Sequence, residues 1–341
     1  MNQPRPPQDP SPDSLGSGLP RTAPAPDSPP PHRSPPPLPR RDPRGHKGTF
    51  GTVAILGGSA FGAGRMIGAP ALSALAALRA GAGLVRLVMP EPILAHGMAL
   101  APSATGIALP VDPSGGIVPH EAARTVDELV AASTCLVIGP GMGAAPGVAA
   151  ATLRAVQQED IPIVVDADAL NALASTPHLF RDFHARAVLT PHPGEFARLA
   201  AVLKIPHSPT DPAARPAAAA TLAQRLGCVV VLKGPGTVVS DGLQTYTCPR
   251  GHPCLGTAGT GDVLAGLVAA LIAQFAPPTA AAQLARPIPG TLSLFDAACI
   301  AVLAHALAGE AWAGSHAAAT GLLATELADA LPAALESLRT S

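Results

Sequence analysis

The segment Gly256–Asp262, which reads GTAGTGD, has the composition of a phosphate-binding loop, and a long apolar stretch follows it directly. Glycine lets the backbone approach a ligand closely, and successive backbone N–H groups in such a loop can bind an anion together. A helix beginning here would direct the positive end of its dipole at the same anion. We therefore predict an anion site at Gly259–Gly261, with Asp262 as a general base beside it. The alternative for Asp262 is only to complement the helix dipole.

Lys233 and His192 follow two other apolar segments and could also act on a ligand. Lys233 precedes the turn Gly234–Thr237, where its amine could bind phosphate or could simply be solvated at the end of a strand. His192 lies between two prolines in the segment TPHPGE, whose restricted backbone would hold the ring in place. The alternative for His192 is a hydrogen bond within its own loop.

Asp166 and Asp168 form a further candidate pair after an apolar segment. Side chains alternate along an extended chain, so the two carboxylates would face opposite sides and at most one would face a site. Asp168 could instead cap a helix predicted at Ala169–Leu173. The sequence has no HExxH motif and no Walker motif, and its glycines do not follow the dinucleotide-binding pattern. A Rossmann dehydrogenase is therefore not indicated.

The elements that must position these residues alternate between short apolar strands and helices. This order predicts a mainly parallel sheet covered on both faces, a doubly wound αβα layer, with the candidate residues meeting at the carboxyl ends of the strands. Two Pro-rich inserts, Ser208–Arg215 and Pro277–Gly290, are expected to be solvent-exposed loops. The predicted strands are Thr52–Leu56, Leu84–Met89, Thr134–Ile138, Ile161–Val165, Ala187–Leu189, Cys228–Leu232 and a hairpin of Thr237–Ser240 with Gln244–Thr247.

The composition of the 341-residue chain excludes several other classes of protein. Its net charge is −1 and only 3% of its residues are aromatic, so no nucleic-acid-binding face is indicated. Five cysteines without a CxxC pair indicate reduced thiols in a cytoplasmic protein, with neither a disulfide framework nor a zinc ribbon. The apolar stretches are too short and too rich in glycine to predict a membrane span.

Prolines divide the chain into two parts. Of 41 prolines, many lie in the first 45 residues, which contain few apolar side chains to bury. Such a segment cannot offset the entropy lost on ordering, so we predict a disordered Pro-rich tail at 1–45 and one domain at 46–338. The tail is expected to be a spacer, although its PxxP spacing could attract a partner.

Six segments of the domain, taken in order, resemble a known family. They are HKGTFG at 46–51, GPGMG at 139–143, VDADALN at 165–171, TPHPGE at 190–195, Lys233-Gly234 with Thr237, and GTGD at 259–262. Together they resemble the ADP-dependent (S)-NAD(P)H-hydrate dehydratases, which also form the C-terminal half of bifunctional repair enzymes. The resemblance covers residues 46–338 and implies a ribokinase-like fold.

The resemblance implies a repair reaction, in which ADP phosphorylates the hydroxyl of hydrated NADH or NADPH and loss of phosphate restores the cofactor. Asp262 would be the catalytic base, and Mg²⁺ would bridge the phosphates, with Glu195 in its outer shell. The hydrate would contact Ala69, Gly141, His192 and Asp262. The nucleotide would contact Lys233, Gly234, Pro235, Gly236, Thr237, Gly259, Thr260 and Gly261.

The sequence departs from the family pattern at two positions. His252 stands where the family usually has Asn, and Ala258 stands at the first position of a usual Gly-Gly pair. These changes put the fine positioning of the ligand in doubt, but the segment Gly259–Asp262 is intact. Two alternatives stay open on the same residues: an ATP-dependent kinase of a vitamin precursor or sugar, and a non-catalytic nucleotide-binding protein.

The resemblance also implies partners. We expect a cytoplasmic homotetramer that binds no nucleic acid and no membrane. The 45 residues before the domain are too few for the epimerase half that often precedes it, so we expect the epimerisation step to lie on a separate chain or to occur spontaneously.

Overall fold

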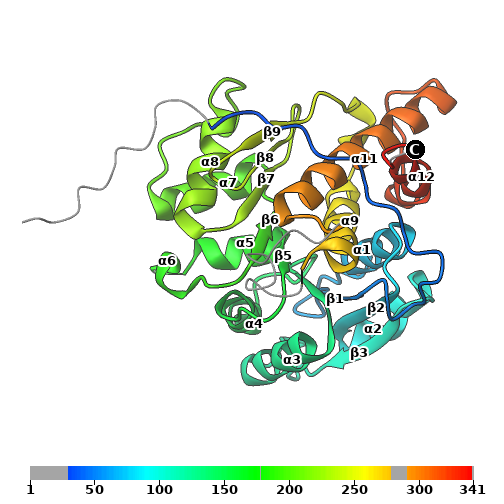
Figure 1. Ribbon diagram of the computed structural model, residues 1–341. Helices are drawn as coiled ribbons and strands as arrows, with labels where there is room; N and C mark the ends of the chain where they lie inside the picture. The colour runs from blue at the N-terminus through cyan, green and yellow to red at the C-terminus, as the bar shows by residue number, and fades with distance from the viewer. Residues whose placement is uncertain (1–29, 177, 278–289, 340–341) are drawn as a thin grey trace, which may run out of the picture.

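The computed structural model describes residues 30–176, 178–277 and 290–339, which build a central sheet between two layers of helices (Figure 1). The strands lie in the order β3-β2-β1-β4-β5-β6-β7-β8-β9. Neighbouring strands are parallel from β3 through β7, and β8 and β9 add an antiparallel hairpin. This confirms the predicted doubly wound αβα layer with a mainly parallel sheet. The bounds are β1 Thr52–Leu56, β2 Leu84–Pro90, β3 Thr105–Leu109, β4 Cys135–Ile138, β5 Ile163–Val165, β6 Ala187–Leu189, β7 Val229–Leu232, β8 Val238–Ser240 and β9 Thr245–Thr247.

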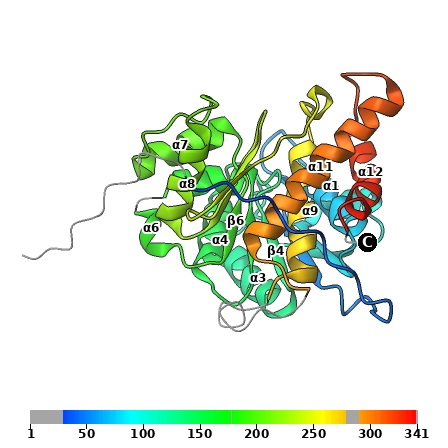
Figure 2. The same ribbon diagram turned by 45° about the horizontal axis from the view of Figure 1, so that its top comes forward.

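Alternate side chains along the strands pack into two separate hydrophobic cores, one on each face of the sheet. In β1, Val53 and Ile55 belong to one core, while Ala54 and Leu56 belong to the other, as the two-residue period of a strand requires. Figures 1 and 2 show the helix layers on opposite sides of the sheet. The first layer holds α1 (Gly68–Arg79), α2 (Glu91–Leu100), α9 (Thr260–Phe275), α11 (Leu294–His316) and α12 (Ala324–Glu336). The second holds α3 (Pro119–Ala132), α4 (Pro146–Gln157), α5 (Ala167–Ala174), α6 (Leu179–Asp182), α7 (Pro193–Leu203) and α8 (Arg215–Leu226).

Helices α1 and α9 pack closely because small residues face each other. A Cβ atom placed on Gly266 would lie 2.1 Å from the carbonyl oxygen of Ser73, so only glycine fits there. The Ser73 hydroxyl donates to the carbonyl of Asp262 at 2.9 Å. This contact holds the first turn of α9, which carries the predicted anion site, against α1.

Helix α11 has the length and composition of a membrane-spanning helix, in contrast to the prediction that the apolar stretches are too short. However, 72% of its most apolar window is buried inside the fold. It packs against α9 and α12, and its residues belong to the first core. Its apolar character is therefore explained by its burial between neighbouring helices and the sheet.

Residues 30–45 pack on the body, which corrects the predicted tail for this part. Leu38 is fully buried, and its amide donates to the carbonyl of Leu338 at 2.8 Å. Arg33 forms an ion pair with Asp296 at 3.0 Å. This packing is not predictable from the sequence, because one buried leucine among prolines carries no periodic signal. The rest of the predicted tail, residues 1–29, lies outside the described residues.

The two predicted inserts have different outcomes. Residues 278–289 of the second lie outside the described residues. The first ends at Arg215, which begins α8 and is only 5% exposed. The expectation of a solvent-exposed loop is therefore confirmed for most of 208–214 and wrong at Arg215.

Candidate active site

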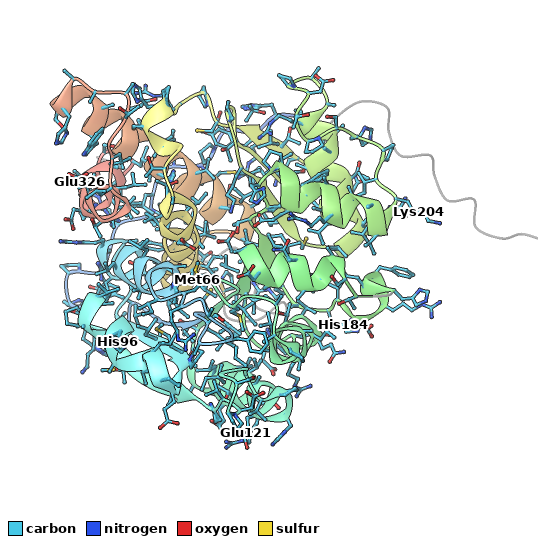
Figure 3. All side chains as sticks on the ribbon, turned by 180° about the vertical axis from the view of Figure 1, so that it is seen from behind. Met66, His96, Glu121, His184, Lys204 and Glu326 are labelled. Atoms are coloured by element: carbon cyan, nitrogen blue, oxygen red, sulfur yellow. The ribbon has the colours of Figure 1, made fainter. Side chains whose placement is uncertain are left out.

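The two predicted contacts Ala69 and Gly141 lie together where the chain order of the sheet reverses, between β1 and β4. A Cβ atom placed on Gly141 would lie 3.2 Å from the Cβ of Ala69 and 3.1 Å from that of Met66. Gly141 has φ +63, a conformation that favours glycine. Figure 3 shows Met66 near the middle of the molecule, whereas Glu121, Lys204 and Glu326 lie at its periphery. In such folds the reversal point is the usual ligand crevice.

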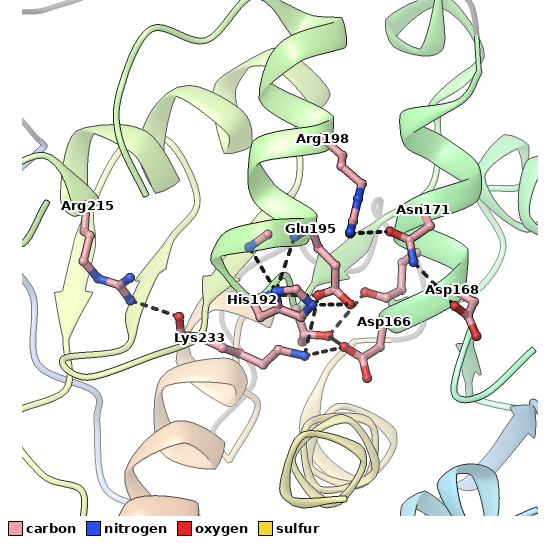
Figure 4. A network of polar contacts seen from close by, with 11 residues as sticks. Asp166, Asp168, Asn171, His192, Glu195, Arg198, Arg215 and Lys233 are labelled. Atoms are coloured by element: carbon pink, nitrogen blue, oxygen red, sulfur yellow. Dashed lines mark hydrogen bonds and ion pairs between the residues drawn. The ribbon is translucent and has the colours of Figure 1, made fainter. Parts of the chain in front are cut away.

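A buried ion-pair network lies at the ends of β5, β6 and β7 (Figure 4). The Lys233 amine lies 2.8 Å from Asp166 Oδ1 and 4.0 Å from Glu195 Oε2. Thr190 donates to the same Asp166 oxygen at 2.6 Å. Burial alone would lower the pKa of Lys233, but Asp166 and Glu195 raise it above its ordinary value, so the amine stays charged.

Asp262, in the first turn of α9, carries the most unusual carboxyl group of the site. Burial, the largest cause, and the charges of Asp166, Asp168 and Glu195 raise its pKa to about 7, with Lys233 opposing them. Within the described residues its carboxyl group accepts no hydrogen bond, and the N-cap residue of α9 is Gly259. The group is therefore available to accept a proton near neutral pH.

Asp166 and Asp168 both act on Asp262, which corrects the prediction that at most one would face the site. The alternation is broken because Ala167 adopts the left-handed conformation, with φ 49, and begins α5. Asp168 lies in the first turn of α5 and accepts a hydrogen bond from the Gly143 amide at 2.7 Å. It thereby ties α5 to the loop that contains Gly141.

His192 and Glu195 hold the start of α7 by a reciprocal capping box. His192 Nδ1 accepts from the amide of Gly194 at 3.0 Å, and Glu195 Oε2 accepts from the amide of His192 at 2.8 Å. Half of the His192 side chain stays exposed, so its ring can still meet a ligand. Burial raises the pKa of Glu195, and Lys233 counters this effect. The hydrogen bond within the loop is present, and a ligand contact by His192 stays a prediction.

A cavity of about 710 Å³ lies beside Lys233 and the start of α9. Its other walls come from residues 248–256 and from α11. Its described lining contains no Phe, Tyr or Trp, so the rings available to a bound base are the imidazoles of His252 and His305, beside aliphatic side chains and backbone. All predicted nucleotide contacts except Gly259 line it, namely Lys233, Gly234, Pro235, Gly236, Thr237, Thr260 and Gly261.

His305 and Arg215 also belong to this region, although neither was predicted as a site residue. His305 lines the cavity, and its Nε2 donates to the carbonyl of Thr260 at 2.9 Å. Burial lowers the pKa of His305 to about 4, so the ring is neutral at pH 7. A single polar residue in the otherwise apolar stretch 297–309 was the available signal. Arg215 lies behind Lys233, and nothing in its local sequence indicates this.

The two departures from the family pattern have local explanations. His252 lines the cavity, and its Nδ1 accepts from the amide of Cys254 at 3.4 Å, which caps the short helix η1 (Pro253–Leu255). Gly259 has φ +91, and a Cβ atom there would lie 2.7 Å from Leu72 Cδ1, whereas Ala258 has an ordinary φ. Alanine is therefore tolerated at 258 and not at 259.

The carboxylates of Asp166 and Glu195 could bind a Mg²⁺ ion only if phosphate oxygens of the nucleotide complete its coordination shell. The described residues contain no group of three or more His, Cys, Asp or Glu that could hold a metal ion alone. Mg²⁺ is commonly held by one or two carboxylates together with nucleotide phosphates. Asp166 and Glu195 could supply those carboxylates beside the cavity.

The comparisons with known proteins agree on one family. A family model for NAD(P)H-hydrate dehydratase matches residues 53–333. A bifunctional NAD(P)H-hydrate repair enzyme from Moorella thermoacetica is 39% identical over 226 residues, which cover 64% of this chain and 41% of that protein. The chain therefore spans less than half the length of this curated relative.

Two solved structures share the fold. An ADP/ATP-dependent NAD(P)H-hydrate dehydratase from Bacillus subtilis, crystallised with ATP and Mg²⁺, superposes with a TM-score of 0.68 at 29% identity, over 89% of this chain and 95% of that one. A ribokinase-like superfamily protein from Enterococcus faecalis gives a TM-score of 0.66 at 23% identity, over 89% and 92% of the two chains.

Proposed function

Because the chain belongs to the NAD(P)H-hydrate dehydratase family, we propose that it is a hydro-lyase that restores NADH or NADPH from the S form of the hydrated nucleotide, with ADP as phosphoryl donor. The observation that carries the proposal is Asp262. It is a carboxylate with a pKa of about 7, free of hydrogen bonds among the described residues, beside the Gly259–Gly261 backbone.

In the proposed reaction, Asp262 takes the proton of the ring hydroxyl as that oxygen attacks the terminal phosphorus of ADP. The bond from this phosphorus to the AMP oxygen breaks, and the phosphate ester forms on the ring. Loss of inorganic phosphate and of a ring proton then restores the double bond of the dihydropyridine. The enzyme's part is to position the reactants and to stabilise charge, which needs no covalent intermediate.

The roles of the other residues follow from their positions. The backbone N–H groups of Gly259–Gly261 and the helix dipole of α9 would stabilise the transferred phosphoryl group. Lys233 would neutralise phosphate charge, because its amine lies 3.5 Å from where a Cβ of Gly261 would be. The hydrate would lie against Ala69, Gly141 and His192. Bound Mg²⁺ would supply charge neutralisation of the phosphates, held through Asp166 and Glu195.

The experiment is to incubate the protein with purified S-form hydrate of NADH, Mg²⁺ and either ADP or ATP. The proposal predicts that the reduced-nicotinamide absorbance returns and that AMP and phosphate appear with ADP. No return of absorbance with either donor would reject it. A stable phosphorylated product from a panel of alcohols with ATP would instead favour the kinase alternative.

We further propose that the enzyme works in the cytoplasm. We also propose that it forms a homotetramer and that a separate epimerase supplies its substrate, the S form of the hydrate. All five cysteines are free and buried, which supports a reducing compartment. Light scattering tests the tetramer against the 33.9 kDa chain. The dependence on an epimerase predicts that the R form is not consumed faster than it converts spontaneously.

A further inference from the structure

Arg215 is a buried cation directly behind the segment Lys233–Gly236. It is 5% exposed, and among the described residues no carboxylate forms an ion pair with it. Its guanidinium donates instead to the carbonyls of Pro209 at 2.7 Å, Leu232 at 2.8 Å and Lys233 at 3.2 Å. Figure 4 shows its side chain reaching the backbone of Lys233. A buried charge without a counter-charge is costly, so its position calls for an explanation.

The carbonyls that Arg215 binds determine how the loop faces the cavity. In a planar trans peptide the C=O and the following N–H point in opposite directions. Because the Lys233 carbonyl points at Arg215, the Gly234 N–H points away from it. The Gly236 carbonyl lies 3.5 Å from the same guanidinium nitrogen, so the Thr237 N–H is also turned away. Gly234 and Thr237 both line the cavity, so Arg215 holds their amides in the orientation that an anion there would need.

The charge of Arg215 also matters at this site. The positive charge of Lys233 is balanced by the carboxylates of Asp166 at 2.8 Å and Glu195 at 4.0 Å. Asp262 adds a further negative charge nearby. Without Mg²⁺, these groups together carry a net negative charge that would repel the phosphates of a nucleotide. Arg215 adds a positive charge from the opposite side of the loop, where the described residues place no carboxylate against it.

We propose that Arg215 is a positioning residue of the nucleotide site: it fixes the amides of Gly234 and Thr237 toward the phosphates and attracts those phosphates by its charge. It acts through the loop, since it does not line the cavity. The proposal rests on the proposed function only in taking an adenine nucleotide as the ligand of this cavity.

The test compares ADP with adenosine, which lacks phosphates. Arg215→Gln should weaken ADP binding about tenfold, as expected for loss of a charge-assisted contact, and leave adenosine binding within about twofold. Arg215→Lys keeps the charge and loses the fork of donors, so its ADP affinity should lie between those of wild type and Arg215→Gln. In the hydrate assay Arg215→Gln should raise KM for ADP more than it lowers kcat. Arg225→Gln, an exposed change on the last turn of α8, is the matched control.

The outcomes separate this proposal from the proposed function. If wild type binds ADP and repairs hydrate, but folded Arg215 variants keep the wild-type preference for ADP over adenosine, the role of Arg215 is rejected. Equal weakening of ADP and adenosine indicates only a structural role and also rejects it. If wild type neither binds ADP nor repairs hydrate, the proposed function fails. If Arg215→Gln does not fold, the test uses Arg215→Lys, whose affinity for ADP should be lower than that of wild type. Hydrogen exchange of the wild-type protein is then measured as well, and ADP, but not adenosine, should protect the amides of residues 234–237.

Discussion

At the residue scale, the proposed function depends on one carboxyl group, Asp262, whose surroundings raise its pKa to about 7. Burial removes Asp262 from water, and Asp166, Asp168 and Glu195 add negative charge around it. Lys233 opposes these effects only in part, because it is already paired with Asp166. The resulting pKa of about 7 suits proton transfer at physiological pH.

The first prediction concerns the pH profile of the reaction. Because the base must be deprotonated, kcat should rise with pH, reach half of its maximum near pH 7 and then level off. Asp262→Asn should lower kcat by about 10²–10⁴-fold while ADP still binds. Asp160→Asn, an exposed change at the amino end of β5, is the control and should retain the wild-type profile. A wild-type profile in Asp262→Asn would contradict the assignment.

The second prediction links the same carboxyl group to stability. Its folded pKa lies above the unfolded value, so between about pH 4 and pH 7 the folded state binds more protons and stability falls as pH rises. Asp262→Asn cannot ionise and should therefore be more stable than wild type at pH 8, by roughly 1–3 kcal/mol, and by less at pH 5. Urea unfolding at the two pH values measures this difference. If the substitution changed the free energy of unfolding equally at pH 5 and pH 8, ionisation of Asp262 would not destabilise the folded state, and the prediction would fail.

At the element scale, the site depends on the close approach of α1 and α9. The Ser73 side chain holds the Asp262 backbone, and Gly266 one turn later leaves room for the Ser73 carbonyl. Separating the two helices would therefore move the anion site away from Ala69 on α1. Helix packing and the geometry of the proposed site are coupled through these contacts.

The third prediction tests this coupling. Gly266→Ala puts a Cβ 2.1 Å from the Ser73 carbonyl oxygen, so α1 and α9 must separate, at a cost of roughly 1–3 kcal/mol. Activity of the remaining folded enzyme should also fall. Gly314→Ala in α11 is the control, since nothing lies within 4 Å of the added methyl, and it should gain roughly 0.5–1 kcal/mol from helix propensity. Thermal unfolding and the hydrate assay would measure both variants.

Elements were predictable where burial produces a clear pattern. Buried strands such as β1 and β7 are continuous apolar runs, and their positions matched the prediction. The edge strand β3 was missed because it is half exposed and its sequence, TGIAL, lacks such a run. Helix α8 was missed because alanines form much of its buried face, which weakens the periodic contrast between buried and exposed positions.

At the scale of the whole molecule, the N-terminal segment 30–45 joins parts of the fold that are far apart in sequence. Arg33 contacts Asp296 in α11 and the backbone of Thr245 in β9. Leu38 reaches the first core beside Leu338. The segment therefore lies along the layer of helices that contains the anion site, and it contributes to the stability of that layer.

The fourth prediction follows from this packing. Leu38→Ala should lower the free energy of unfolding by roughly 2–4 kcal/mol, because it leaves a cavity in the core. The folded fraction should keep wild-type kcat, since Leu38 does not contact the site. Leu243→Ala is the control, because Leu243 is 81% exposed. Urea unfolding of both variants measures the effect, and an unchanged midpoint for Leu38→Ala would contradict the packing of this segment.

Local chemistry is enough to identify the fold class, the family and several candidate residues, including His192, Lys233 and Asp262. Glycine-rich turns, the TPHPGE segment and Asp262 are readable along the chain, because each depends on neighbouring residues. The αβα layering follows in the same way from continuous apolar strands that alternate with helices.

Only the folded arrangement decides how those residues act. The pKa of Asp262 depends on carboxylates from α5 and α7, and the amides of Gly234 and Thr237 are oriented by Arg215 from α8. Likewise, the left-handed Ala167 brings both Asp166 and Asp168 to the site, against the alternation expected for an extended segment. Electrostatic and burial effects act through space, between residues separated by tens of positions, so no local pattern in the chain encodes them.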